Sequence, residues 1–289
     1  MFYFLAIGAM LAYALQQTLL VHHARKVDGL SLAFYRNVSF GITLLPLLIG
    51  TTRSDIAVIL SFWPLLLASG IAGGVYLGMI FASYKFLPAG IGTSVSIAVS
   101  TICIGMFGWV FLQESISPAG LALMAVILVG VLVMGVQHKH FSHLDGRFLL
   151  GIVIAAVGTV PVAFVKYALT VISREANPLA SGYFWELSIG IGCLLLLLAR
   201  STFTSHHIQK ISMRDFLVIG ACSAPTLIGT GLFALAVSKG PIAIVGAIGS
   251  GSLVVTSLLA WLWYREKLSM GQWAAMALII AGVIGLKFV

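Results

Sequence analysis

Three charged residues, Arg36, Lys166 and Glu186, stand inside otherwise apolar stretches of this chain. A charged side chain is costly inside a lipid bilayer, so it usually faces a cavity or a partner of opposite charge. If the stretches at 148–170 and 178–199 form a hairpin of two helices, Lys166 and Glu186 lie roughly 8 and 12 Å below the same membrane face, within reach of each other. Arg36 lies roughly 9 Å from the opposite face by the same helical rise.

These three residues predict ion or proton chemistry inside a membrane. We interpret Glu186 as the carboxylate that binds a proton or another cation, with Lys166 as the neighbour that tunes it. Competition of proton, substrate and lysine for one carboxylate would couple their movements. A permanent ion pair that fixes the two helices together is the alternative. Arg36 fits either a structural or gating role or the binding of an anionic substrate group.

Polar and aromatic side chains on other apolar stretches could line the same cavity. Tyr13 and Gln17 share one face of a helix at i,i+4 spacing, as do Ser96 and Ser100. Each could instead form hydrogen bonds between helices, and Tyr and Trp near the ends of a span are typical interfacial anchors. The candidates for substrate binding, besides the three charged residues, are Tyr13, Gln16, Gln17, Tyr76, Ser96, Ser100, Tyr183, Trp185, Thr230, Ser250 and Ser252.

Other kinds of chemistry find little support in the sequence. It contains no Gly-Lys-Ser/Thr loop for phosphate. All seven histidines fall between the apolar stretches, so no Ser–His–carboxylate set is expected. We therefore expect neither an enzyme nor a cofactor. His138, His140 and His143 could face a transition metal, but no Cys or carboxylate cluster accompanies them and no metal site is predicted. Without a basic aromatic face, no nucleic-acid partner is expected.

Membrane-spanning helices are the elements that must position the candidate residues. The chain is 60% hydrophobic and 8% charged, with a mean hydropathy of +1.10, whereas soluble domains carry roughly 25% charged residues. Lipid must therefore be the solvent for most of its surface, and each span needs about 20 apolar residues. We predict ten spans, at about 2–21, 30–50, 60–84, 91–112, 118–136, 148–170, 178–199, 215–237, 241–263 and 270–288.

An internal repeat organises these spans. A shift of 152 residues aligns Trp109 with Trp261 and Glu114 with Glu266 without a gap. Five spans per half is an odd number, so the second half crosses the membrane in the opposite sense, and inverted repeats are typical of alternating-access transporters. The predicted units are a five-helix repeat at 1–136, a connecting loop at 137–147 and a second five-helix repeat at 148–289.

Small residues and prolines within the spans predict how the helices pack. Small residues at four-residue spacing let helix backbones approach closely in lipid, and proline kinks a helix or locally opens it. Both features serve packing or, alternatively, a moving cavity wall. The residues are Gly70, Gly74 and Gly78 in the third span, Ala277, Ala281 and Gly285 in the tenth, and Pro161 and Pro225 in the sixth and eighth.

Several short motifs resemble one family of transporters. They are Phe-Ala-Ser-Tyr-Lys-Phe at 81–86 and Gln-Glu-Ser-Ile at 113–116, with partners in the second half, Phe-Ala-Leu-Ala at 233–236 and Arg-Glu-Lys-Leu at 265–268. Arg36 matches an arginine often found early in the second span. The chain resembles, over essentially its whole length, the drug/metabolite transporter superfamily and within it the ten-helix proteins with two EamA-type repeats.

This resemblance implies a central cavity formed by spans 1–4 and 6–9, with spans 5 and 10 as peripheral supports or dimer contacts. Lys166 and Glu186 depart from the family pattern. We expect an all-α integral membrane protein that moves a small metabolite, such as an amino acid or an amine, by alternating access. Export is expected, driven by proton exchange or by the substrate gradient. A lipid or lipid-linked carrier translocase and a non-transporting membrane scaffold are the alternatives.

The expected location is the bacterial inner (cytoplasmic) membrane, where the chain contacts lipid as a monomer or a homodimer. Ten spans place both termini on one side. Four Lys and Arg residues fall on that side and ten on the other, which favours termini outside the cell. Ten-helix relatives are thought to have cytoplasmic termini, so both orientations stay open.

Overall fold

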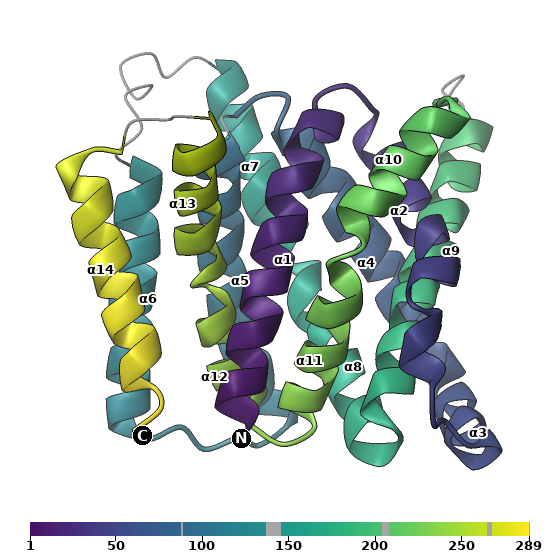
Figure 1. Ribbon diagram of the computed structural model, residues 1–289, viewed down its shortest axis with the longest axis horizontal. Coiled ribbons are helices and arrows are strands. Elements are labelled where there is room, and N and C mark those ends of the chain that lie inside the picture. Colours follow the sequence, from purple (N-terminus) through teal and green to yellow (C-terminus); the bar gives the residue numbers. More distant parts are fainter. Residues whose placement is uncertain (88, 137–145, 204–207, 265–267, 289) are drawn as a thin grey trace.

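The computed structural model of the chain describes residues 1–87, 89–136, 146–203, 208–264 and 268–288. Every regular element in those ranges is a helix (Figure 1). In chain order they are α1 (Phe2–Ala24), α2 (Gly29–Thr43), the 3-10 helix η1 (Leu45–Leu48), α3 (Arg53–Ser61), α4 (Trp63–Ser83), α5 (Ala89–Phe111), α6 (Pro118–Val136), α7 (Gly146–Thr159), α8 (Pro161–Glu175), α9 (Pro178–Phe203), α10 (Met213–Ser223), α11 (Thr226–Val237), α12 (Ile242–Gly249), α13 (Ser252–Tyr264) and α14 (Met270–Gly285).

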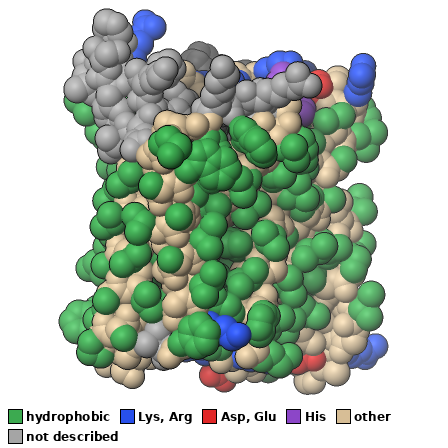
Figure 2. All heavy atoms as spheres, turned by 60° about the vertical axis from the view of Figure 1, so that its left-hand side comes forward, with side chains coloured by type: hydrophobic (Ala, Val, Ile, Leu, Met, Phe, Trp, Pro, Cys, Tyr) green, Lys and Arg blue, Asp and Glu red, His purple; other side chains and the backbone are tan. Residues whose placement is uncertain are grey.

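The helices stand upright side by side, and both termini lie at one end of the bundle, called the terminal end below (Figure 1). Hydrophobic side chains cover the flank between two ends that carry Lys and Arg (Figure 2). Seven helical stretches in the described residues are long and apolar enough to cross a membrane. The other predicted spans correspond to α2 with η1 and to the shorter apolar helices α6 and α14. The fold is that of an all-helical, multi-pass membrane protein.

Breaks in the second half fall at the predicted prolines and at one further place. α7 ends at Thr159 and α8 begins at Pro161, while Pro225 separates α10 from α11. Because proline lacks a backbone N–H and clashes with the preceding turn, it starts a helix well but cannot continue one. The predicted kinks are confirmed. A third break, at Ser250 and Gly251 between α12 and α13, was not predicted.

The second predicted span differs from the structure. α2 ends at Thr43, and η1 follows with Pro46 in its first turn. Residues 53–61, expected to be mainly a connection, form the separate helix α3 at the terminal end (Figure 1). Thr52 and Asp55 form a capping box at its start, which satisfies backbone N–H groups that have no partner within the helix.

Glycine allows the closest helix contact in the bundle, between α4 and α9. A Cβ atom on Gly70 would overlap the backbone carbonyl of Ser188, and one on Gly192 would overlap the backbone of Gly70. A Cβ atom on Gly74 would lie 3.0 Å from the backbone nitrogen of Cys193. The predicted packing role of the glycines in the third span is therefore confirmed for this crossing.

The small-residue prediction for the tenth span is confirmed for Gly285 but not for Ala277 and Ala281. α14 packs on α6 through Gly282 and Gly285, whose Cβ positions would lie 2.5 and 2.7 Å from side-chain atoms of Ile127 and Leu123. Ala277 and Ala281 are exposed on the other side of α14. Four-residue spacing alone cannot distinguish two faces of a helix that is apolar all round. α6 and α14 stand together at one side of the bundle (Figure 1).

The two halves pack on each other reciprocally. α1 of the first half lies against α11, α12 and α13 of the second, and α7 and α8 of the second half lie against α4 and α5 of the first. The first predicted span of each half thus contacts the third and fourth spans of the other half. This arrangement brings residues from both halves to the centre of the bundle.

Candidate functional site, a polar cavity between the two halves

A cavity of about 170 Å³ lies where the two halves meet. Helices α1, α2, α4 and α5 line it from the first half, and α8, α9, α11, α12 and α13 line it from the second. Most of the predicted candidates contribute to its wall. They are Tyr13, Gln16, Gln17, Arg36, Tyr76, Ser96, Ser100, Lys166, Trp185, Glu186, Ser250 and Ser252.

Glu186 lies at the centre of a hydrogen-bonded network in the cavity wall. It is 2% exposed, and its Oε1 accepts a hydrogen bond of 2.9 Å from the Thr230 hydroxyl. Its Oε2 accepts one of 3.2 Å from Asn37 Nδ2 and lies 3.7 Å from Nη1 of Arg36. Both carboxylate oxygens are thus engaged, as a buried charge requires.

Arg36 and Asn37 form the first-half side of this network. Arg36 Nη1 donates to Asn37 Oδ1 at 2.9 Å, and Asn37 Nδ2 also donates to the backbone carbonyl of Glu186 at 2.9 Å. The guanidinium lies 4.6 Å from the ring centroid of Phe40, which gives it a cation–π contact. Asn37 was not predicted as a site residue, although it is the direct neighbour of Arg36.

The partner of Glu186 differs from the one considered in the sequence analysis. There Lys166 was the expected neighbour, whereas in the structure the cation nearest the carboxylate is Arg36. Lys166 Nζ instead lies 5.0 Å from the ring centroid of Phe233. Across the described ranges Lys166 has no carboxylate partner. The assumption of a hairpin between neighbouring spans could not predict that α2 packs against Glu186.

Thr230 and Tyr183, both predicted to line the cavity, lie elsewhere. Thr230 is fully buried behind the cavity wall, where Tyr13 donates its hydroxyl proton to Thr230 Oγ1 at 3.0 Å while Thr230 donates to Glu186. It therefore links the cavity-lining Tyr13 to the carboxylate. Tyr183 packs in a separate apolar cluster, and its hydroxyl donates to the Gly41 carbonyl at 3.3 Å.

Two hydrogen bonds join the halves at residues of the cavity wall, Glu186 and Ser250. Asn37 bonds to Glu186, and Thr101 bonds to Ser250 at 2.6 Å between side-chain oxygens. Both pairs are 149 residues apart, close to the offset that aligns the two halves in the sequence. Both halves of the chain thus contribute polar side chains to hydrogen bonds beside the cavity.

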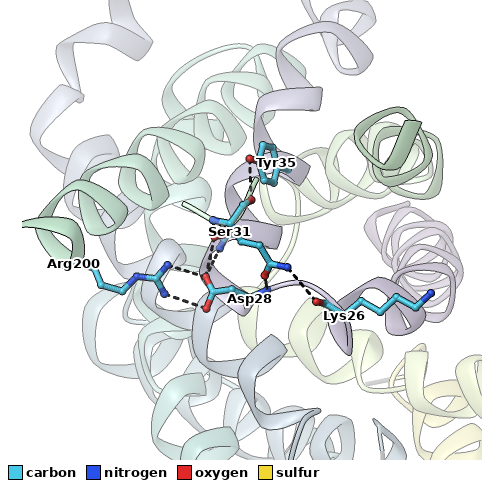
Figure 3. Close-up of polar contacts among 6 residues, drawn as sticks. Lys26, Asp28, Ser31, Tyr35 and Arg200 are labelled. Atoms are coloured by element: carbon cyan, nitrogen blue, oxygen red, sulfur yellow. Dashed lines mark hydrogen bonds and ion pairs between the residues drawn. The ribbon is translucent and has the colours of Figure 1, made fainter. Parts of the chain in front are cut away.

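An ion pair and several hydrogen bonds join the two halves at the end of the bundle opposite the termini. Arg200 at the end of α9 donates to both carboxylate oxygens of Asp28, at 3.1 and 3.0 Å (Figure 3). The Asp28 backbone N–H donates to Gln209 Oε1 at 2.6 Å, and the Tyr35 hydroxyl donates to the Gln209 carbonyl at 3.1 Å. Burial raises the pKa of Asp28, but hydrogen bonds from Arg200 and Ser31 outweigh it and leave this pKa below its ordinary value.

A second contact between the halves ties the terminal end. Glu114, which follows α5, accepts a hydrogen bond of 2.8 Å from Arg174 at the end of α8. The same carboxylate accepts from the backbone N–H of Ile242 at 3.0 Å, so it also caps α12, where a negative charge is favoured by the helix dipole. Arg174 additionally donates to the carbonyl of Gly240 at 3.2 Å. Glu114 is one of the motif residues singled out in the sequence.

Metal binding has no candidate cluster among the residues that the structure describes. The histidines considered for a metal, His138, His140 and His143, lie outside the described residues, as do 265–267 of the last motif.

Comparison with known proteins gives a consistent picture. The sequence model of the EamA-like transporter family matches residues 1–136 and 148–288. A solved structure titled "Crystal structure of protein" is similar in fold, with a TM-score of 0.73 at 18% sequence identity, over 98% of this chain and 95% of that one. A search of curated proteins gives no match.

Proposed function

The chain belongs to the EamA-like transporter family, and we propose that it is a secondary transporter that carries one small metabolite at a time through the central cavity. As a multi-pass membrane protein of this family it has a small-molecule substrate and lies in lipid. The proposal adds ten spans in two inverted five-helix repeats, alternating access of the cavity to the two sides, and export across a bacterial cytoplasmic membrane.

The polar cavity is the observation that supports this proposal. Buried charge and unpaired polar groups are costly in an apolar bundle, so a bundle that served only as a scaffold would be expected to fill its centre with apolar side chains. Here the wall includes Arg36, Lys166 and Glu186 together with hydroxyl groups from both halves. A non-transporting scaffold gives no reason for such a centre.

The contacts at the two ends support alternating access. Asp28–Arg200 at one end and Glu114–Arg174 at the other each join the first half to the second. Opening either end requires that its contact breaks, and the interrupted helices α7/α8, α10/α11 and α12/α13 supply places where a span can bend. In this proposal the halves rotate about the two-fold axis that would relate the two inverted repeats, so that one end opens while the ion pair at the other end stays formed.

Glu186 is the proposed coupling group. When Glu186 carries a proton, it has no negative charge to pair with Arg36. Its protonated oxygen is then itself a hydrogen-bond donor and faces another donor, from Asn37 or Thr230. Protonation would thus loosen the contact between α9 and both α2 and α11. A change of protonation could in this way be linked to movement of the two halves.

The test is solute counterflow in proteoliposomes with an imposed pH gradient, for wild type, Glu186→Gln and Glu175→Gln. Glu175 is an exposed carboxylate at the end of α8, so its variant controls for loss of charge alone. We expect a transported solute whose accumulation depends on the pH gradient in wild type and in Glu175→Gln but not in Glu186→Gln. An unchanged pH dependence in Glu186→Gln contradicts the coupling role, and absence of any solute movement contradicts transport.

A further inference from the structure

We propose that the transported solute is a monoanion, such as an organic carboxylate, whose negative group binds Lys166. This inference rests on the proposed transport function and adds the chemical class of its substrate. It differs from the expectation of an amine as substrate, and it follows from how the charges of the cavity are used.

The cavity carries an unbalanced positive charge. Among the described side chains that line it, Arg36 and Lys166 are the cations and Glu186 is the carboxylate, so two positive charges face one negative charge and leave a formal excess of +1. An uncompensated charge within the bilayer is costly. A solute with one negative charge would bring the occupied cavity to neutrality, whereas a cationic solute would raise the excess.

Glu186 already has donors at both of its carboxylate oxygens. Its Oε1 accepts from Thr230, and its Oε2 accepts from Asn37 and lies against Arg36. An ammonium group would have to share these oxygens with the donors already present, and displacing one of them would leave a buried donor unpaired. The cavity therefore does not favour recognition of an organic cation through its carboxylate.

Lys166 is the cation that is free to bind a solute. Arg36 is already engaged, because its Nη1 donates to Asn37 and lies 3.7 Å from Glu186 and its guanidinium lies over the ring of Phe40, although its buried Nε has no partner in the described residues. In the part of the chain that the structure describes, Lys166 has no hydrogen-bond acceptor or carboxylate; its ammonium lies 5.0 Å from the Phe233 ring centroid. The three N–H donors of a lysine suit a carboxylate or another oxyanion as a point charge.

The aromatic and amide side chains of the cavity wall indicate which groups the uncharged part of the solute carries. Phe233 and Trp185 line the cavity with Lys166, and Trp185 is fixed because its Nε1 donates to the Val165 carbonyl at 2.9 Å. Such rings suit an apolar or aromatic group next to the anion. Gln17 of α1 also lines the cavity, and its Oε1 is buried with no hydrogen-bond partner in the described residues, so an N–H or O–H donor on the solute would satisfy it.

The probes for the test are three compounds with one carbon skeleton: 3-phenylpropionate, 3-phenylpropanamide and 3-phenylpropylamine. Binding is measured calorimetrically to the full chain in an uncharged detergent, and counterflow is measured separately in phosphatidylcholine vesicles. The variants are Lys166→Gln, Lys166→Arg, which keeps the charge, and Lys287→Gln. Lys287 is the matched control because it also lies over phenyl rings, at 5.5 and 5.6 Å from the centroids of Phe4 and Phe288, but does not line the cavity.

We expect the carboxylate to bind more tightly than the amide and the amine. Its Kd should rise about 10-fold or more in Lys166→Gln, as for loss of one charge-assisted hydrogen bond, and should change little in Lys166→Arg and Lys287→Gln. Preference for the amine or amide, equal loss in Lys287→Gln, no loss in Lys166→Gln, or no binding of the carboxylate overturns the inference.

Counterflow separates this inference from the proposed function. Exchange of amines or neutral solutes without a need for Lys166 would leave transport standing and overturn the monoanion. Carboxylate binding that depends on Lys166 without exchange of any solute would support the anion site and contradict transport. Binding of anionic phosphatidylglycerol itself tests a lipid headgroup as the source of the anion. If the lipid binds wild type more tightly than 3-phenylpropionate does and Lys166→Gln abolishes its binding, the site belongs to the lipid and a free solute is overturned.

Discussion

The close crossing of α4 and α9 can be tested with one methyl group. In Gly70→Ala, the new Cβ would overlap the carbonyl of Ser188, and because that atom is backbone the clash can be relieved only if the two helices move apart. Alanine in place of glycine gains about 1 kcal/mol of helix propensity, whereas overpacking at a rigid contact costs about 3 kcal/mol. We expect a net loss of about 2 kcal/mol of stability.

Gly41→Ala is the matched control. Gly41 also lies in a helix, α2, but a Cβ atom there would meet nothing within 4 Å, so only the propensity gain of about 1 kcal/mol applies. Thermal inactivation in detergent, followed by loss of monodisperse protein, should occur at a lower temperature in Gly70→Ala and at an equal or higher one in Gly41→Ala. Because Ser188 is two residues from Glu186, Gly70→Ala should also impair solute exchange. Wild-type stability in Gly70→Ala would refute the close crossing.

Three further outcomes are expected from the polar contacts. Thr230→Val keeps the shape of the side chain but removes a hydrogen bond to a buried carboxylate, so stability should fall by about 1.5–3 kcal/mol and the pH dependence of exchange should change; a variant equal to wild type in both assays contradicts the network. Asp28 has a lowered pKa in the folded protein because its hydrogen bonds outweigh the effect of burial. Its stabilising contribution should therefore be present above the unfolded pKa of about 3.9 and be lost as the pH falls through the lower folded pKa. The temperature of thermal inactivation should fall over this pH range in wild type by more than it does in Asp28→Asn. Glu114→Gln weakens the contact with Arg174, so labelling of a cysteine placed in the cavity by a membrane-impermeant maleimide from the terminal side should become faster, and an unchanged rate argues against a gate there.

Much of the site could be predicted because charge is rare in this sequence. Arg36, Lys166 and Glu186 stood out against apolar surroundings, and the cost of burying charge in lipid implied that they share a cavity, whose wall contains all three. Most polar candidates line it as well. The organisation in repeats was visible in Trp109, Glu114 and their counterparts, and the family comparison matches both halves of the chain.

Contacts between distant segments could not be predicted from spacing. The pairing of Glu186 with Arg36 and Asn37 depends on how α2 packs against α9, and two helices next to each other in sequence gave Lys166 as the neighbour instead. Asn37 could not be predicted as a site residue, because a single amide in a span is equally consistent with a hydrogen bond between helices. The break at Ser250 and Gly251 lacked a proline. Gly285 was predicted to pack but Gly282 was not, because apolar residues surround α14 and spacing alone does not locate the packed face.

Alternating access requires that the central cavity open to each side of the membrane in turn, and labelling of one cavity residue from both sides tests this. Ser100 lines the cavity, and within the described residues its hydroxyl donates only to the carbonyl of Ile97 in its own helix. Ser100→Cys in a background without Cys103, Cys193 and Cys222 should therefore be tolerated. We predict that impermeant maleimide labels this cysteine in vesicles of either orientation, and that a transported solute slows labelling in both. Labelling from one side only, or from neither, would contradict alternating access through this cavity.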